Sequence, residues 1–384
     1  MRDNFLQILF DSLSIVGVII LVVLVITFGI QLYYYFGSYL RILKFSPKAK
    51  TRQVDGISVV ILVEENESFF SELMPRLVTQ DYENYEIMLV DVIDNNEISS
   101  TLEILSANNP KIKVTTLSQK NSHNKISNKM AYNLGIKAAK YENIVITTAD
   151  ALPCSTKWLR CMAEGFETSS VVIAYSGIEK GEGFNNKLMR CSRLSQAMRY
   201  LSLAIKGRTY RGSICNLGFT REQYFKASGF NFLNLNIGED DLFIQKIATK
   251  DNTAVILDPD SVVNQPQLGN LRWWRKERMF LSVAFKYYLP WVKRFIRGEM
   301  LTRFLFFALI AASVIILPLY YKIFVVSLFL IRSLISIIIF NKIAKKLGED
   351  SLKLAFFVYD IFALWAEIRL WVLRKIKPLK GVWR

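Results

Sequence analysis

The feature that most constrains this chain is a long apolar stretch near its beginning, in which no charged residue occurs between Asp11 and Arg41. Its core, SIVGVIILVVLVITFGIQLYYYF, is long enough to cross the roughly 30 Å of hydrocarbon in a bilayer. We therefore expect a transmembrane helix. A cleaved signal peptide is the alternative, but this stretch is longer than the apolar part of a signal peptide, and no small-residue cleavage site follows it.

Two further apolar stretches, 304–321 and 323–341, flank Lys322. Pro318 and Lys322 lie where a tight hairpin would turn, so we predict two spanning helices with almost no loop between them. Arg332 falls in the middle of the second stretch. An ionisable residue at that depth is expected to face protein or water, either packing against other helices or approaching a substrate path.

The net charge of +16 is placed mainly beside these apolar stretches. Basic residues follow the first stretch and precede the second: Arg41, Lys44, Lys48, Lys50 and Arg52, then Lys293, Arg294, Arg297 and Arg303. The positive-inside rule then predicts a multi-pass protein of the inner cell membrane, with its catalytic domain in the cytoplasm. Because the charge clusters beside the spans, we expect no nucleic-acid partner.

The end of the chain carries a narrow polar stripe on an apolar segment, 351–374. Lys353, Asp360, Glu367 and Arg374 recur every seven residues, so they line one side of a helix. The segment suits an interfacial helix or a further span, and the basic residues after it favour the interfacial choice. Four parts are expected: an anchor (1–41), a cytoplasmic domain (42–302), a transmembrane hairpin (303–341), and an amphipathic helix with a basic tail (342–384).

The cytoplasmic part alternates strand and helix patterns from residue 54 onward. Buried strands are predicted at 57–63, 86–93, 112–117 and 144–148, with helical spacing at 68–80 and 125–141. This order predicts an α/β domain with a mostly parallel sheet covered on both faces. Ligands of such sheets bind beyond the carboxyl ends of the strands. Asp91 and Asp150 both lie at such ends.

Histidine and cysteine chemistry is not expected. The only histidine, His123, lies in the polar run SQKNSHNKISNK, which excludes a site built from several histidines. The four cysteines form no Cys-x-x-Cys pair and lie in the predicted cytoplasmic part, where reduced thiols are expected.

Two later segments also carry candidate functional residues. GEDDLF places Glu239, Asp240 and Asp241 at a loop-to-helix boundary, where acidic residues are also typical of a simple helix cap. LRWWRKERMF places two tryptophans beside Arg275 and Arg278. Its alternative interpretation is an amphipathic helix on the membrane surface.

Taken in order, these segments resemble the membrane-anchored family-2 glycosyltransferases, and are similar to bacterial, cellulose-synthase-like members. The resemblance rests on NKMAYNLGIKAAKYENIVITTADALPCSTKWL, GSICNLGFTREQYFKASGF, GEDDLF and RKERM, and covers roughly 54–300. It implies the nucleotide-sugar-binding A-type glycosyltransferase fold with flanking transmembrane helices.

The resemblance also implies roles for individual residues. Asp150 would hold a divalent cation, Mg²⁺ or Mn²⁺, with reduced affinity because Thr148 stands where the family has a second acid. Asp240 would be the catalytic base, with Glu239 as the alternative in another register. Nucleotide-sugar contacts are expected from Glu65, Asp91, Arg275 and Arg278, and acceptor-side roles from Asn216 and Trp274.

The implied function is transfer of a sugar from a nucleotide diphosphate sugar to a lipid-linked or glycan acceptor at the membrane, in polysaccharide biosynthesis of the cell envelope. The departures at Thr148, Glu65-Asn66 and Val92 leave an alternative, in which the chain is a catalytically weak or inactive relative. Such a subunit would bind or assemble other glycan-synthesis proteins. The donor sugar, the acceptor, the linkage and the oligomeric state are not readable from the sequence.

Overall fold

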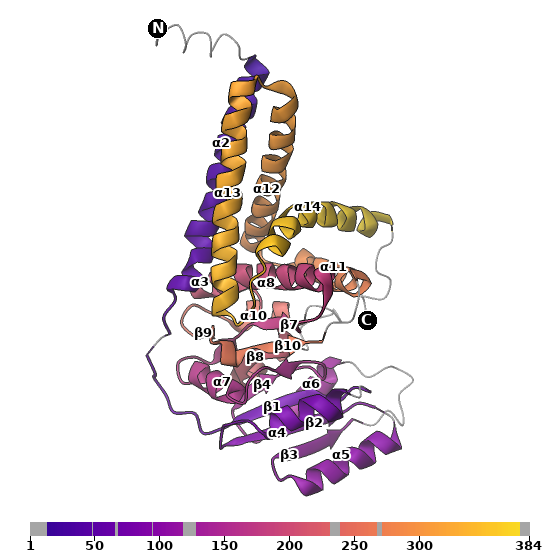
Figure 1. Ribbon diagram of the computed structural model, residues 1–384. Coiled ribbons are helices and arrows are strands. Elements are labelled where there is room, and N and C mark those ends of the chain that lie inside the picture. Colours follow the sequence, from indigo (N-terminus) through magenta and orange to yellow (C-terminus); the bar gives the residue numbers. More distant parts are fainter. Residues whose placement is uncertain are drawn as a thin grey trace.

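The computed structural model describes residues 14–47, 49–65, 68–93, 95–117, 128–230, 239–266 and 271–376. A column of long helices stands on an α/β domain (Figure 1). Its first helix runs from Ile15 to Lys44 and comprises α2 (Ile15–Leu32), the π-helical segment η1 (Tyr33–Tyr39) and α3 (Leu40–Lys44). The other two are α12 (Pro290–Ile316) and α13 (Leu319–Lys346). In the described part of the chain these three helices are long and apolar enough to cross a membrane.

The hairpin between α12 and α13 is tighter than the sequence predicts. Only Leu317 and Pro318 separate the two helices, and Pro318 caps the start of α13. Lys322 lies inside the first turn of α13, so the prediction that it forms part of the turn was wrong. Proline at this position lacks the N–H that a preceding helix would need, which explains why α12 ends there.

The central sheet has seven strands in the order β3-β2-β1-β4-β8-β6-β9. The first four are parallel to one another, β8 is antiparallel to both β4 and β6, and β9 is parallel to β6. The four predicted strands are confirmed. The bounds are β1 (Ile57–Leu62), β2 (Tyr85–Asp91), β3 (Ile112–Thr116), β4 (Asn143–Ile146), β6 (Val171–Ile173), β8 (Leu217–Thr220) and β9 (Thr253–Val255).

Helices cover both faces of this sheet, and both faces are apolar. On one face, η2 (Phe69–Leu73), α4 (Met74–Val78), α5 (Asn96–Asn108) and α7 (Trp158–Phe166) pack on alternate strand residues. On the other lie α6 (Asn128–Ala138) and α8 (Gly183–Ile205). Because each strand alternates its side chains between faces, two buried faces require the nearly continuous apolar strands that the sequence shows.

A second, three-stranded sheet and several short helices complete the domain. The sheet has the order β5-β10-β7 and lies at the ends of the central strands. Its strands are β5 (Leu152–Pro153), β7 (Ser176–Ile178) and β10 (Val263–Gln265). The short helices are η3 (Ile214–Asn216), α9 (Arg221–Lys226), α10 (Glu239–Ile247), η4 (Pro259–Ser261) and η5 (Phe285–Tyr287).

Two more helices lie crosswise beside the end of the column that is nearer the sheet domain. They are α11 (Leu271–Ala284) and α14 (Lys353–Ile376), and Figure 1 shows α14 running across the direction of the long helices. Asp360 and Glu367 of α14 both bond inward, which confirms that the polar stripe lies on one side of a helix. The opposite side of α14 is apolar and exposed.

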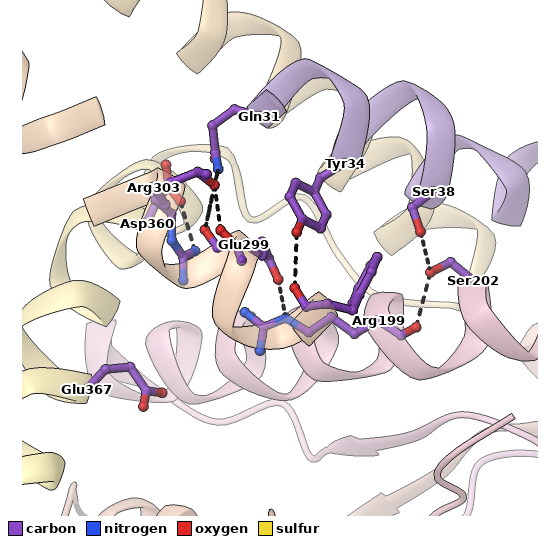
Figure 2. Close-up of polar contacts among 12 residues, drawn as sticks. Gln31, Tyr34, Ser38, Arg199, Ser202, Glu299, Arg303, Asp360 and Glu367 are labelled. Atoms are coloured by element: carbon purple, nitrogen blue, oxygen red, sulfur yellow. Dashed lines mark hydrogen bonds and ion pairs between the residues drawn. The ribbon is translucent and has the colours of Figure 1, made fainter. Parts of the chain in front are cut away.

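A buried polar network joins the column to the domain beneath it (Figure 2). Arg332 of α13 is fully buried, bonds to Asp360 of α14 and donates to Gln31 Oε1 at 3.2 Å. Arg303 of α12 lies 3.3 Å from the same aspartate. In addition, Arg199 of α8 pairs with Glu299 of α12 at 2.7 Å. The prediction that Arg332 faces protein is confirmed, because its charge is balanced by a carboxylate inside the fold.

Candidate active site

The loop after β4 holds Thr148 and Asp150, as the sequence predicts. The Thr148 hydroxyl donates to Asp150 Oδ1 at 2.6 Å, and Gln265 Nε2 of β10 donates to Asp150 Oδ2 at 3.0 Å. Both carboxylate oxygens therefore have protein partners. Asp150 is half-buried, so a ligand can still reach it from the carboxyl edge of the sheet.

A second carboxylate, Glu64, approaches Asp150 from the neighbouring strand. In the β1–β4 register Val60 pairs with Ile146, so Glu64 and Asp150 each lie the same number of residues beyond a paired position. Partial burial and the negative charge of Asp150 raise the pKa of Glu64. From the sequence, Asp150 is the one predicted metal ligand, and the neighbouring Glu65 is predicted as a nucleotide-sugar contact. The strand pairing itself ends at Val60 and Ile146, and the electrostatic effect of Asp150 on Glu64 indicates that the two carboxylates are near each other.

The surroundings of these acids offer oxygen donors for a hard cation. They are the Asp150 and Glu64 carboxylates and the Thr148 hydroxyl, and Mg²⁺ and Mn²⁺ prefer such ligands. Cys215 Sγ lies 3.3 Å from the Thr148 hydroxyl, but burial raises the pKa of this thiol to about 11. Sulfur is in addition a soft ligand, which Mg²⁺ and Mn²⁺ disfavour relative to oxygen. The described residues contain no group of three or more His, Cys, Asp or Glu side chains able to hold a metal, so part of the coordination would have to come from the ligand and water.

Asp91 lies at the end of β2 and is almost completely buried. Its Oδ1 accepts from the Ile93 backbone N–H at 2.9 Å, and its Oδ2 accepts from the Ser99 hydroxyl at 2.7 Å. These bonds connect the end of β2 to α5. Asp91 thus shapes the loop at the strand end, while Glu65, after β1, is exposed at the same edge of the sheet.

Of the three acidic residues at the start of α10, only Asp241 has a described side chain. Asp241 is fully buried, ion-paired with Arg211 at 3.3 Å, and accepts a hydrogen bond from the Tyr288 hydroxyl. Burial and the adjacent Asp241 raise the pKa of Tyr288 well above its usual value, so it remains a donor. Glu239 and Asp240 belong to the first turn of α10, but their side chains lie outside the described residues.

The arginine segment forms α11, which packs between α8 and α14. Trp274 is 4% exposed and donates from Nε1 to the Ser192 hydroxyl at 2.9 Å. Arg278 forms an ion pair with Glu367 of α14, and its guanidinium lies 5.9 Å from the Trp274 ring centroid. The side chain of Arg275 lies outside the described residues.

Asn216 is a buried structural residue. Its amide donates to the backbone carbonyls of Tyr175 at 2.7 Å and Ser261 at 2.8 Å, and its Oδ1 accepts from Trp158 Nε1 at 3.0 Å. Its exposure is 0%, so its side chain does not contact an acceptor directly. It would affect acceptor binding only by holding in place the segments that it bonds to. Its predicted acceptor-side role stays a prediction.

Helix α8 connects the separate parts of the site, although none of its residues was predicted from the sequence to be a site residue. Ser192 holds Trp274, Arg193 donates to Gln265 Oε1 at 2.9 Å, and Gln196 accepts from Arg211 Nη1 at 3.2 Å. Gln265 in turn binds Asp150, and Arg211 binds Asp241. The polar residues at 192, 193 and 196 could have indicated this role from the sequence. However, a polar stripe on a long helix is equally typical of a surface in contact with solvent.

Comparison with known proteins identifies the class. The sequence model of glycosyl transferase family 21 matches residues 19–378, nearly the whole chain. The chain therefore belongs to glycosyl transferase family 21. This corrects the expected family: the segments that resemble family-2 enzymes belong to a family-21 chain. No curated protein sequence matches.

Solved structures show the same fold. The chain is similar to the mannosyltransferase PcManGT from Pyrobaculum calidifontis in complex with GDP-Man and Mn²⁺, with 19% identity and a TM-score of 0.52. That similarity covers 90% of this chain and 99% of the other. Similarity to S. aureus TarS 1–349 with UDP-GlcNAc has 13% identity, covers 80% of this chain and 91% of the other, and has a TM-score of 0.41. The expected A-type glycosyltransferase fold with flanking apolar helices is confirmed.

Proposed function

We propose that this protein transfers a sugar from a nucleotide diphosphate sugar to a membrane-associated glycan or lipid-linked acceptor. Membership of glycosyl transferase family 21 supports a glycosyl transfer reaction. The observation that carries the proposal is the pair of carboxylates, Asp150 and Glu64, at the carboxyl ends of two adjacent parallel strands. This is the edge of an open α/β sheet where ligands bind.

In the proposed site, Asp150, Glu64 and Thr148 would hold a divalent cation. When bound, Mg²⁺ or Mn²⁺ supplies positive charge that stabilises the departing nucleoside diphosphate. The PcManGT structure holds Mn²⁺ together with GDP-Man, and we propose that this chain also binds a divalent cation with its nucleotide sugar. Asp240, or Glu239 in the other register, would remove the proton of the acceptor hydroxyl.

The position of the candidate site supports an acceptor that reaches it from the membrane. The crosswise helices α11 and α14 lie beside the ends of the long apolar helices that are nearer the sheet domain (Figure 1). Trp274 and Arg278 both belong to α11. A lipid-linked acceptor would therefore meet the site beside the bilayer surface.

Thermal shift with nucleotides tests the proposal. The purified protein is heated with UDP or GDP, with and without Mn²⁺, and the unfolding midpoint is compared. A ligand present at 100 times its Kd adds about 2.7 kcal/mol to the stability of the folded state, which raises the midpoint by several degrees. We expect at least one nucleotide to raise the midpoint, and Mn²⁺ to increase that shift.

Two variants connect the shift to the proposed metal site. Asp150→Ala should abolish the Mn²⁺ dependence, and Thr148→Asp should strengthen it by adding a second carboxylate. Glu103→Gln, which changes an exposed carboxylate of α5, is the matched control and should behave like the unaltered protein. If neither nucleotide raises the midpoint, the enzyme proposal is wrong, and the alternative of an inactive assembly subunit replaces it.

A further inference from the structure

Arg278, the described arginine of the RKERM segment, is held by two partners. Its guanidinium pairs with the Glu367 carboxylate and faces the Trp274 ring, with 5.9 Å to the ring centroid. The side chain of Arg278 is only 12% exposed and that of Glu367 is 19% exposed. An ion pair this shielded orients its members, whereas exposed pairs contribute little.

Glu367 is itself fixed by the packing of α14. Its neighbour Ala366 lies in a buried cluster with Trp274, Ile178 and Met189, and Phe362 packs against that cluster. The Trp274 and Phe362 rings lie 5.8 Å apart between centroids. The carboxylate therefore reaches Arg278 from a helix that is anchored to α8 and α11, not from a mobile loop.

A small cavity adjoins this ion pair. Its volume is about 140 Å³, and its lining includes Arg278, Glu367, Arg211, Tyr288 and Arg199. Arg211 and Tyr288 also hold Asp241, in the acidic run that contains the proposed base. The rest of its lining is largely apolar and includes Leu281, Phe285 and Met300. Arg278 thus borders a cavity that it shares with the two residues that hold Asp241.

We propose that Glu367 is a positioning residue, which orients Arg278 to bind the diphosphate of the nucleotide sugar. A guanidinium carries five N–H donors in a planar fork, so one edge can bind a carboxylate while the others bind phosphate oxygens. Fixing the long arginine side chain beforehand lowers the conformational entropy lost when the phosphate binds. This inference rests on the proposed function, since it assumes that the chain binds a nucleoside diphosphate.

A double-mutant cycle tests this inference. Kd values of UDP, GDP and the matching monophosphates are measured by calorimetry with Mn²⁺ for the unaltered protein, Arg278→Ala, Glu367→Ala and the double variant. Arg278→Ala should weaken diphosphate binding by about 10- to 100-fold, as expected for a lost charge-assisted hydrogen bond. Glu367→Ala should weaken it by about tenfold and leave the monophosphate Kd unchanged, a pattern that general loss of structure would not produce. In the Arg278→Ala background, Glu367→Ala should have no further effect on diphosphate binding.

Two more variants complete the experiment. Glu367→Gln keeps an acceptor oxygen for Arg278 and should restore part of the lost affinity. Asp350→Asn, which removes the carboxylate of the exposed Lys180–Asp350 pair, is the control and should leave both Kd values unchanged. Additive effects of Arg278→Ala and Glu367→Ala, or an equal loss of monophosphate and diphosphate binding, would overturn the inference while the proposed function stands. Failure of the unaltered protein to bind any nucleotide would overturn the proposed function first.

Discussion

Several buried charged residues of the described fold pair with a residue that lies far away in the sequence. Arg332 bonds to Asp360, Arg199 to Glu299, and Arg278 to Glu367. Isolated charges at membrane depth or in a core are costly, so each of these contacts decides where two helices meet. The heptad spacing on α14 predicts that Asp360 and Glu367 share a side, but it does not name their partners.

Asp360 is the residue whose loss should destabilise the fold most. Burial would raise its pKa, but Arg332 and Arg303 more than offset this, so its pKa lies below the usual value. Asp360→Asn leaves two buried guanidinium groups without this countercharge and should cost about 3–5 kcal/mol, measured as a lower thermal midpoint in detergent. Adding Arg332→Met should recover part of the loss.

The pH dependence of the same contact follows from the direction of the pKa shift. A depressed folded-state pKa means that the stabilisation is present above the unfolded pKa of about 3.9 and is lost as the pH falls below it. Asp360→Asn should therefore differ from the unaltered protein at neutral pH, with the gap closing below about pH 4. An unchanged midpoint at neutral pH would contradict the importance assigned to this network.

Among the helices, α14 has two different sides, one packed against the protein and one exposed. Its inner side carries Asp360 and Glu367, while its outer side presents apolar residues within one narrow sector: Leu354, Val358, Ile361, Trp365, Ile368 and Val372, all exposed. Arg332, which contacts Asp360, lies about 20 Å along α13 from the α12–α13 turn at 1.5 Å per residue. In a bilayer of about 30 Å, that depth would place α14 near the boundary on the side of the α/β domain.

We expect the outer side of α14 to lie in the lipid interface. Ile361→Cys, made in a Cys154→Ser background and labelled with an environment-sensitive fluorophore, should be quenched by brominated lipids in nanodiscs. Glu103→Cys on α5 is the control and should not be quenched, because Figure 1 shows α5 at the far end of the α/β domain. Equal quenching at both positions would contradict an interfacial α14.

For the whole molecule, we expect one cytoplasmic domain beneath three spans. The basic ends of the first and last spans meet, since the Lys346 ammonium donates to the Ile42 carbonyl at 2.9 Å. The α/β domain follows the first span and precedes α12 on this side. Both connections therefore leave the bilayer on the face that the positive-inside rule assigns to the cytoplasm.

Labelling in intact cells tests this orientation. In a Cys154→Ser background, a membrane-impermeant maleimide should modify Leu319→Cys, at the exposed start of α13, without cell lysis. It should modify Glu103→Cys only after the membrane is permeabilised. Labelling of Glu103→Cys in intact cells would place the α/β domain outside the cytoplasm.

The three apolar helices, strands at 57–63, 86–93, 112–117 and 144–148, and the acids at their carboxyl ends could all be predicted from the sequence, and the structure has these strands to within two residues at each end. Those features depend on local periodicity and length, which neighbouring residues record directly. The placement of Asp91 and Asp150 follows from the same patterns, because parallel strands bring their ends to one edge.

Only the folded structure shows which side chains meet at the carboxyl edge of the sheet, and which meet where the long helices contact α14. Adjacent parallel strands bring Glu64 near Asp150, and helix packing pairs Arg278 with Glu367 and Arg332 with Asp360. It also makes α8 the element that connects the parts of the site. These contacts join segments far apart along the chain, and their geometry exists only after the sheet and the helices have packed, so no local pattern contains it.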